Sequence, residues 1–349
     1  MKKFHLHFRR YCAGIVGIVF LITGILKLWD PVGTMLIVTE YFKFLGLAGL
    51  APAAKAAGIG MAFLECIVGI GLITGVLRKA SAVAAYVLTG IFTVLTLLLW
   101  IFDAPMDCGC FGQALHLTHA QSFWKNIVLL ALCLAAFVPF REFGQAKTHR
   151  SVAAVLSTLL IVAAAIYSNT HLPIVDFTAF NWGSQLFSSL DDEAGEAEFR
   201  NAPILSFSDA SGAYCDDLAA SGKVLVFSVY DAEKADWARL EEHYRAALAT
   251  DVLPLVLVAG AREDLPLAPD IQPYFCDYKT LITLNRSNGG GTYFYYGELI
   301  HKWSARHFPS DLAKDVADDP IALSTRHIIR RRITAQGFCV ALAAILILV

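Results

Sequence analysis

The sequence predicts an α-helical, multi-pass membrane bundle with an appended α/β soluble domain. Hydrophobic residues make up 56% of the 349 residues and charged residues only 17%, whereas a soluble globular chain is about 45–50% apolar. The mean hydropathy is +0.56, and the apolar residues gather in long runs within the first half of the chain. From about residue 170 to 325, charged stretches alternate with β-branched and aromatic ones, as in a soluble domain.

Five apolar runs have the length that a helix needs to cross a bilayer core of about 30 Å. They are Tyr11–Leu28, Gly58–Leu77, Ser81–Phe102, Phe123–Phe140 and Val152–Tyr167. Asp30-Pro31 should end the first helix, because proline disfavours helical geometry in the residue before it. The segment Pro31–Lys55 is mixed in character, and we expect either a short helix on the membrane surface or a loop packed over the bundle.

Basic residues mark one side of this layout. They cluster at the N-terminus, at Arg78-Lys79 and between Arg141 and Arg150, and the positive-inside rule assigns that side to the cytoplasm. In a bacterium this predicts a protein of the cytoplasmic (inner) membrane whose soluble domain faces the periplasm. A last apolar run, Ile333–Val349, follows four arginines at 326–332 and either crosses the membrane or forms a half-buried helix.

The soluble segment alternates strands and helices. Lys223–Tyr230 and Val252–Ala259 are near-continuous apolar runs, typical of strands buried on both faces. Between them, Asp231–Ala249 has helical spacing. A helix is expected near Tyr278–Leu284. A β-hairpin is expected from Thr292–Tyr296 and Leu299–Trp303, which completes the order β-α-β-α-β-β.

A loop between the third and fourth runs carries Cys108-Gly109-Cys110. Closing a disulfide across one residue strains the bond, and strained, exposed disulfides are often labile or catalytic. Because the loop should face outward, oxidants and partner thiols should reach both cysteines. Two alternatives stay open: two unpaired cysteines in a tight loop, or a soft-metal site formed by Cys108, Cys110, His116 and His119.

Ionisable residues lie at the same level of the bundle. Lys27 ends the first run, Glu65 lies inside the second, and Lys125 opens the fourth. Charges inside a membrane are costly and indicate function, with a partner. A Lys27–Glu65 pair would satisfy both charges and would move protons as the thiols oxidise. It would alternatively be a structural pair that fixes helix packing, or Lys27 would extend to the interface.

The remaining six cysteines divide into two groups. Cys12, Cys66, Cys133 and Cys339 fall within apolar runs, where cysteine behaves as a small buried hydrophobe. Cys215 and Cys276 belong to the soluble segment. They are candidates for one structural disulfide in an oxidising compartment.

Residues 10–140 resemble the DoxX/MauE family of small bacterial membrane proteins. The residues that carry the resemblance are Thr23–Pro31 (TGILKLWDP), Glu65–Leu72 (ECIVGIGL) and Asp107–Gly112 (DCGCFG). The resemblance implies a four-helix membrane bundle in a redox setting, with thiol handling during maturation of secreted enzymes or a quinone-linked role. A quinone is therefore the cofactor that the resemblance implies.

The soluble segment resembles a thioredoxin-like domain, most clearly over Leu281–Trp303, and departs from it at two places. Where thioredoxins place Cys-x-x-Cys, this chain has Ser228–Lys234 (SVYDAEK). Where they place a cis-proline, it has Asn288–Thr292 (NGGGT). Both hallmarks of the redox site are missing, so this domain is expected to be degenerate and not itself a thiol oxidoreductase.

The sequence thus predicts four parts: a four-helix membrane domain at 1–150, a fifth transmembrane helix at 151–170, a soluble domain at 171–325, and a basic segment with a short apolar helix at 326–349. The first functional hypothesis is a thiol-disulfide or quinone-linked oxidoreductase component, with Cys108, Cys110, Glu65 and Lys27 at its site and a secreted or periplasmic thiol protein as partner. A non-enzymatic scaffold and a metal-handling membrane protein are the alternatives. The net charge of −2 says nothing about nucleic acid, but no basic domain stands out, and no nucleic-acid partner is expected.

Overall fold

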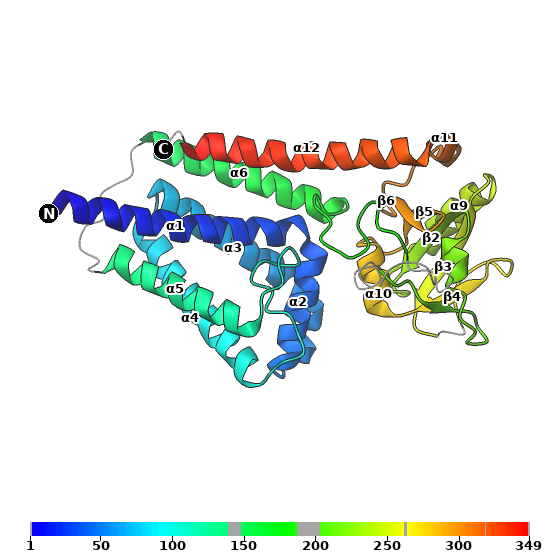
Figure 1. Cartoon of the computed structure of the whole chain (residues 1–349), viewed down its shortest axis with the longest axis horizontal. Coiled ribbons are helices and arrows are strands. Elements are labelled where there is room, and N and C mark those ends of the chain that lie inside the picture. Colours follow the sequence, from blue (N-terminus) through cyan, green and yellow to red (C-terminus); the bar gives the residue numbers. More distant parts are fainter. Residues whose placement is uncertain (1, 139–147, 187–202, 262–263, 318, 348–349) are drawn as a thin grey trace, which may run out of the picture. The chain divides into compact units, whose positions relative to one another are not determined.

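The structure is a computed structural model, and it describes residues 2–138, 148–186, 203–261, 264–317 and 319–347. The chain divides into two compact units (Figure 1). The membrane unit comprises Met1–Val175 and Thr334–Val349, and the sheet unit comprises Asp176–Ile333. The predicted end of the fourth apolar run at Phe140, the basic residues 141–147 and the acidic residues 191–193 lie outside the described residues.

Helices dominate the membrane unit. They are α1 (Lys2–Trp29), α2 (Pro31–Phe44), a 3-10 helix η1 (Ala48–Ala53), α3 (Ala54–Thr74), α4 (Arg78–Ile101), α5 (His119–Phe137) and α6 (Thr148–Thr170). Among the described residues, five helical segments are long and apolar enough to cross a membrane, and they contain α1, α3, α4, α5 and α6. The five predicted spans are therefore confirmed as helices of membrane-spanning length and composition, which implies a lipid bilayer around them.

Four of these helices form a bundle. Helix α1 packs chiefly on α3 and also on α5, α4 packs on α5, and α6 lies against α3 and α1 (Figure 1). Small and medium apolar side chains fill the interior between α1, α3, α4 and α5, including Val16, Val68, Ala82 and Cys133. The predicted four-helix core thus corresponds to α1, α3, α4 and α5, and the additional helix corresponds to α6.

The α1–α3 contact depends on three glycines. A Cβ atom at Gly24 would lie 2.6 Å from both the Ala62 carbonyl oxygen and the Cys66 Sγ, and a Cβ at Gly69 would lie 2.7 Å from the Gly17 oxygen. Real Cβ atoms do not approach other atoms so closely, so only glycine fits. Small residues of this kind let two membrane helices bring their backbones together.

Segment Pro31–Phe44 is a helix, so the loop alternative is wrong for these residues. Asp30 caps it, because its Oδ1 accepts a hydrogen bond from the Gly33 N–H at 2.8 Å, and Pro31 occupies the first helical position, where its missing N–H costs nothing. The Thr34 hydroxyl donates to the Lys27 carbonyl oxygen at 2.9 Å and ties the two helices at their junction. Whether α2 lies on the membrane surface stays a prediction.

The last helix is longer than predicted. Helix α12 runs from Pro320 to Ile347 (Figure 1), so the arginines at 326–332 lie within one continuous helix and not in a separate basic segment. Arginine is a good helix former, and no proline breaks this stretch. Leu323 packs into the core of the sheet unit. In the membrane unit, the Phe338 ring meets the Trp29 ring edge-on at 5.9 Å.

The sheet unit is built on one six-stranded sheet in the order β1-β4-β3-β2-β5-β6. Its strands are β1 (Phe207–Ser208), β2 (Lys223–Val229), β3 (Leu253–Ala259), β4 (Pro273–Cys276), β5 (Gly290–Tyr295) and β6 (Glu298–Trp303). Its shorter helices are α8 (Asp217–Ala220), α9 (Trp237–Leu248), α10 (Tyr278–Leu284) and α11 (Leu312–Ala317). Strands β2, β3 and β4 run parallel, whereas β5 is antiparallel to β2 and β6 is antiparallel to β5, so the sheet is mixed.

The central strands match their predictions because both of their faces are buried. Residues of β2 and β3 contribute alternately to two apolar clusters on opposite faces of the sheet. The predicted hairpin turns at Tyr296 and Gly297, whose positive φ angles of 47° and 78° suit the tight two-residue turn of a hairpin. Strands β1 and β4 are not predicted, since one has two residues and the other begins with proline.

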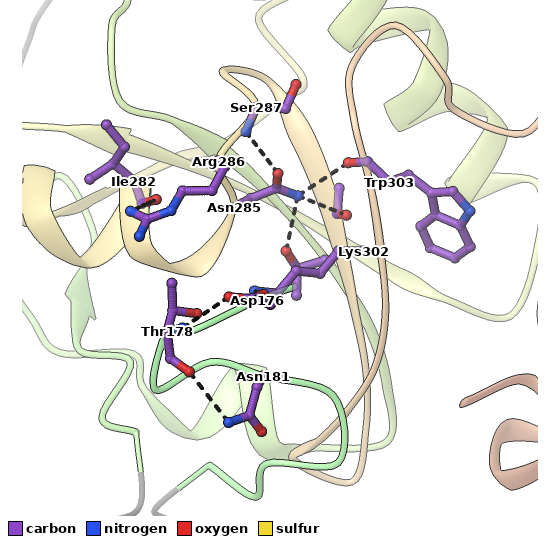
Figure 2. Close-up of polar contacts among 11 residues, drawn as sticks. Asp176, Thr178, Asn181, Ile282, Asn285, Arg286, Ser287, Lys302 and Trp303 are labelled. Atoms are coloured by element: carbon purple, nitrogen blue, oxygen red, sulfur yellow. Dashed lines mark hydrogen bonds and ion pairs between the residues drawn. The ribbon is translucent and has the colours of Figure 1, made fainter. Parts of the chain in front are cut away.

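A buried polar network fastens the start of the sheet unit to its hairpin (Figure 2). The Lys302 Nζ lies 2.7 Å from the Asp176 Oδ2, and both side chains are buried. Asn285 donates to the carbonyl oxygens of Gly291 and Trp303, each at 3.1 Å, and accepts from the Ser287 N–H at 3.0 Å. Each of these buried polar groups therefore has partners, as burial requires.

The first testable consequence concerns the α1–α3 glycines. Gly24→Ala and Gly69→Ala should each destabilise the detergent-solubilised protein by about 1–3 kcal/mol, because the added methyl group overpacks the contact. Gly60→Ala is the matched control, since a Cβ there meets nothing within 4 Å. Thermal unfolding of the three variants measures the difference. Equal midpoints for Gly60→Ala and Gly69→Ala would contradict the close approach of the two helices.

Candidate functional site

The two cysteines of the loop between α4 and α5 face each other. Their Sγ atoms are 2.7 Å apart, and both cysteines are free. Gly109 makes this possible. Its φ of +63° suits glycine, and a Cβ atom there would collide with the Ile37 side chain of α2. Any other residue between the thiols would push the loop away from α2.

Hydrogen bonds from neighbouring elements hold the loop in place. The Tyr41 hydroxyl of α2 donates to the Cys108 carbonyl oxygen at 2.7 Å. The His119 Nε2 lies 3.0 Å from the Ala104 carbonyl oxygen. Helix α5 starts with a capping box in which Thr118 and Gln121 exchange hydrogen bonds. This cap places the start of the helix four residues before the predicted Phe123.

Burial contradicts one expectation about the pair. Cys108 is only 4% exposed, and Cys110 is half-buried. The expectation that both thiols lie open on an outward loop is therefore wrong for Cys108. The cause is α2, which folds over the loop and covers it with Ile37 and Tyr41.

Lys27 and Glu65 form the pair that the sequence suggested. The Lys27 Nζ lies 2.8 Å from Oε1 and 2.7 Å from Oε2 of Glu65, and the side chains are 5% and 1% exposed. Lys27 therefore does not extend to the interface. Its ammonium also lies 5.9 Å from the centre of the Phe92 ring, within the range of a cation–π interaction. Two opposite charges at this depth satisfy each other.

A single cavity of about 360 Å³ joins the thiols to this ion pair. Cys108, Cys110, Lys27, Glu65 and Lys125 all line it, and most of the remaining wall is apolar side chains from α1 to α5. Cavities of roughly 300–1,000 Å³ with an apolar wall and a few converging polar groups are typical of small-molecule sites. The structure therefore brings every predicted redox-site residue to one cavity.

The two thiols differ electrostatically. The hydrogen bond from the Cys108 thiol, together with the ammonium groups of Lys125 and Lys27, lowers the pKa of Cys110 to about 6 against the effect of burial. The same contact and burial raise the pKa of Cys108. Asp107, which precedes Cys108, faces His116 at the surface, 3.5 Å from its Nε2. Near neutral pH, Cys110 is therefore favoured as the thiolate, and Cys108 keeps its proton.

The alternative metal site is not assembled. His116 is exposed and faces Asp107, while the His119 ring contacts a backbone carbonyl. Within the described part of the chain, no group of three or more His, Cys, Asp or Glu side chains is placed to hold a metal ion. Cys108 and Cys110 therefore meet each other without the two histidines.

The other cysteines are also placed by the structure. Cys12, Cys66 and Cys133 are buried, as expected, but Cys339 is exposed on α12. Cys215 and Cys276 are both free, and their thiols donate to the carbonyl oxygens of Ala213 and Ser206 respectively. The predicted structural disulfide of the sheet unit is therefore not formed.

Two residues of the site were missed from the sequence. Tyr41 holds the loop, and Ser122 is fully buried near the start of α5, where its hydroxyl has no hydrogen-bond partner within the described residues. Neither has a sequence signal, because a tyrosine in a mixed segment and a serine near a helix start are common. Only the folding of α2 and the start of α5 bring them to the thiols.

The ion pair yields a prediction about stability. Glu65→Gln leaves the Lys27 charge buried without a counter-charge, and Lys27→Met does the same to Glu65, so each change should cost about 3–5 kcal/mol. The double variant Lys27→Met/Glu65→Gln should recover part of that loss, because no charge remains buried. Denaturant unfolding in detergent measures all three. Additive losses in the double variant would mean that the two side chains do not interact.

Comparison with known proteins agrees with part of the resemblance. Residues 5–139 match the family model described as methylamine utilisation protein MauE. No curated protein and no solved structure matches the chain. The matched residues cover α1 to α5, and with them the cavity, the ion pair and the two thiols. Residues 5–139 of this multi-pass membrane protein are therefore similar to the MauE family.

Proposed function

We propose that this protein exchanges disulfides with a thiol protein through Cys108 and Cys110. The observation that carries the proposal is the common cavity, in which two adjacent thiols meet a buried ion pair and a second lysine. Thiol exchange needs a thiolate, and a cation near a cysteine supplies one. A purely structural cysteine pair has no need of these charges.

The electrostatics favour one direction of exchange. A thiol pair whose reduced form is stabilised makes an oxidising disulfide, and the lysines stabilise the reduced form through the Cys110 thiolate. The disulfide would therefore accept two electrons from a partner dithiol. Both CGC sulfurs become reduced and the partner forms a disulfide. The partner dithiol gives up two protons, of which Cys108 takes one, and the other is released because Cys110 leaves as a thiolate.

Regeneration of the CGC disulfide needs a two-electron acceptor. A lipid-soluble quinone is the acceptor class that the DoxX/MauE resemblance implies, and a cavity of about 360 Å³ has room for a small ring. The Lys27–Glu65 pair lies on the wall of the same cavity. It would carry the protons that leave the thiols when they are oxidised.

The sheet unit supports a partner-binding role. Its elements run β2-α9-β3-β4-α10-β5-β6, which is the β-α-β-α-β-β order of the thioredoxin-like proposal with strand β4 added between β3 and α10. At the place of the thiol motif, the Asp231 N–H donates to the Asn288 Oδ1 at 3.0 Å, and the Asn288 Nδ2 donates to the Asp231 carbonyl oxygen at 2.7 Å. Two hydrogen bonds between Asp231 and Asn288 thus occupy the place where a thioredoxin has its thiols. We assign substrate docking, not redox chemistry, to this unit.

A scaffold without redox chemistry is the second candidate function. The same polar contact in the sheet unit favours it, together with the free state of Cys215 and Cys276. In that case the bundle only anchors a binding domain, and the CGC pair is dispensable.

The orientation belongs to the same proposal. The basic residues near the start of α1 and at Arg78-Lys79 are expected in the cytoplasm. The CGC loop and the sheet unit would then face the periplasm of a bacterial inner membrane, where disulfides persist.

Reporter fusions test this orientation. A fusion at Gln145 should report the cytoplasm and a fusion at Glu196 should report the periplasm, because one apolar helix, α6, separates them. An alkaline phosphatase and a fluorescent protein, each fused at both sites, give the reciprocal readouts. The same compartment at both sites would exclude the layout.

Thiol trapping tests the exchange itself. In acid-quenched cells, part of the Cys108/Cys110 population should become alkylated only after reduction, because it exists as a disulfide. The Cys108→Ser/Cys110→Ser variant should lose the oxidised species and leave a partner protein reduced. Cys215→Ser/Cys276→Ser is the control, and it should retain both the oxidised Cys108/Cys110 species and the oxidised partner. A partner unaffected by the loss of Cys108 and Cys110 would favour the scaffold.

A further inference from the structure

The two thiols of the pair are held in different ways. Cys108 is 4% exposed, and its carbonyl oxygen accepts from the Tyr41 hydroxyl. Cys110 is half-buried, and both cysteines line the cavity that Lys125 also lines. Cys110 as a residue is therefore the more exposed of the two.

Lys125 is placed to act on Cys110. It lies on α5, two turns after the capped start, and its ammonium sits 5.1 Å from the centre of the Phe111 ring, the residue that follows Cys110. The Phe111 contact holds the lysine over the loop. Lys27, the other cation of the cavity, is occupied by both oxygens of Glu65. Within the described residues, Lys125 makes no such ion pair with a carboxylate.

We propose that Cys110 is the sulfur that bonds to the partner, that Cys108 is the resolving thiol, and that Lys125 is the positioning residue that holds the Cys110 thiolate. This inference rests on the proposed function and assigns the order of its steps. It follows from the exposure of Cys110, the cover over Cys108 and the place of Lys125 above the loop.

The steps balance as follows when the protein oxidises a partner dithiol. A partner thiolate attacks the Cys110 sulfur, the Cys108–Cys110 bond breaks, and Cys108 leaves with the electron pair and takes up a proton. The second partner thiolate then attacks the first partner sulfur, which is bonded to Cys110 in the mixed disulfide. The bond to Cys110 breaks, and Cys110 leaves as a thiolate beside Lys125. Two electrons pass from the partner to the pair.

The charges suit this order. Exchange is faster when the leaving thiol has the lower pKa, so the second step, in which Cys110 leaves, is assisted by Lys125. The first step has the poorer leaving group, Cys108, but it opens a ring closed across a single residue, which is strained. The reverse assignment would require a partner to reach beneath Tyr41 and Ile37.

Single cysteine variants test the assignment in the full-length protein. In Cys108→Ser, the Cys110 thiolate should attack the disulfide of the oxidised partner, and one partner sulfur leaves as a thiolate. The mixed disulfide on Cys110 should then accumulate, visible as a reducible higher-mass band, since no Cys108 thiol remains to attack it. Cys110→Ser should accumulate at least tenfold less. Equal accumulation, or accumulation in Cys110→Ser alone, overturns the inference while leaving thiol exchange intact. If neither variant traps a partner and the wild-type pair stays reduced, the proposed function fails as well.

The role of Lys125 has a separate readout, the pH profile of alkylation by iodoacetamide in the Cys108→Ser background. Burial opposes a thiolate and Lys125 favours it, so Lys125→Met should move the profile to higher pH by about one pKa unit and slow alkylation by about tenfold on the acidic side of the profile. Lys125→Arg should restore the profile. Lys43→Met, on the exposed side of α2, is the matched control. An unchanged profile in Lys125→Met, or no rescue by arginine, overturns the role of Lys125.

Discussion

The bidentate contact between Lys27 and Glu65 is the constraint on which the membrane unit depends. Two charges cannot be buried at this depth unless the helices that carry them are fixed to within a hydrogen-bond length. Gly17, Gly24 and Gly69 supply that fixity by letting the α1 and α3 backbones touch. The pair sits directly below the junction of α1 and α2, where Thr34 bonds back to the Lys27 carbonyl oxygen. The position of α2 therefore follows from the same contact.

The position of α2 in turn fixes the loop that carries the two thiols. Ile37 leaves no room for a side chain at position 109, and Tyr41 holds the Cys108 backbone. Gly112 of the same loop packs over Lys27, with a virtual Cβ 3.5 Å from its Cγ. The thiols, the ion pair and Lys125 thus share one apolar-walled cavity. In such surroundings each charge acts more strongly than in water, and this is why one sulfur of a chemically identical pair is favoured as a thiolate.

Much of this organisation was predictable, and the errors have physical causes. The five spans and the strands β2, β3, β5 and β6 were predicted because run length and β-branched composition are local properties. The end of α12 was predicted, but not its start, since the arginines at 326–332 look like a boundary and yet continue the helix. Cys215 and Cys276 were considered together only because they share a domain, and each instead donates to a nearby carbonyl.

The sequence by itself determined the membrane bundle, the separate sheet unit and the residues of the candidate site, because hydrophobic length, periodicity and residue chemistry are written along the chain. The tertiary structure alone decided which of them meet. Cys108 lost its expected exposure because α2 folds over it. His116 faces Asp107, and the His119 ring contacts the Ala104 carbonyl oxygen, so neither histidine is paired with the thiols. Lys125 lies near Cys110 because the capping box fixes where the loop ends and α5 begins. Such encounters depend on distances between helices, and these are set by packing, which no local pattern records.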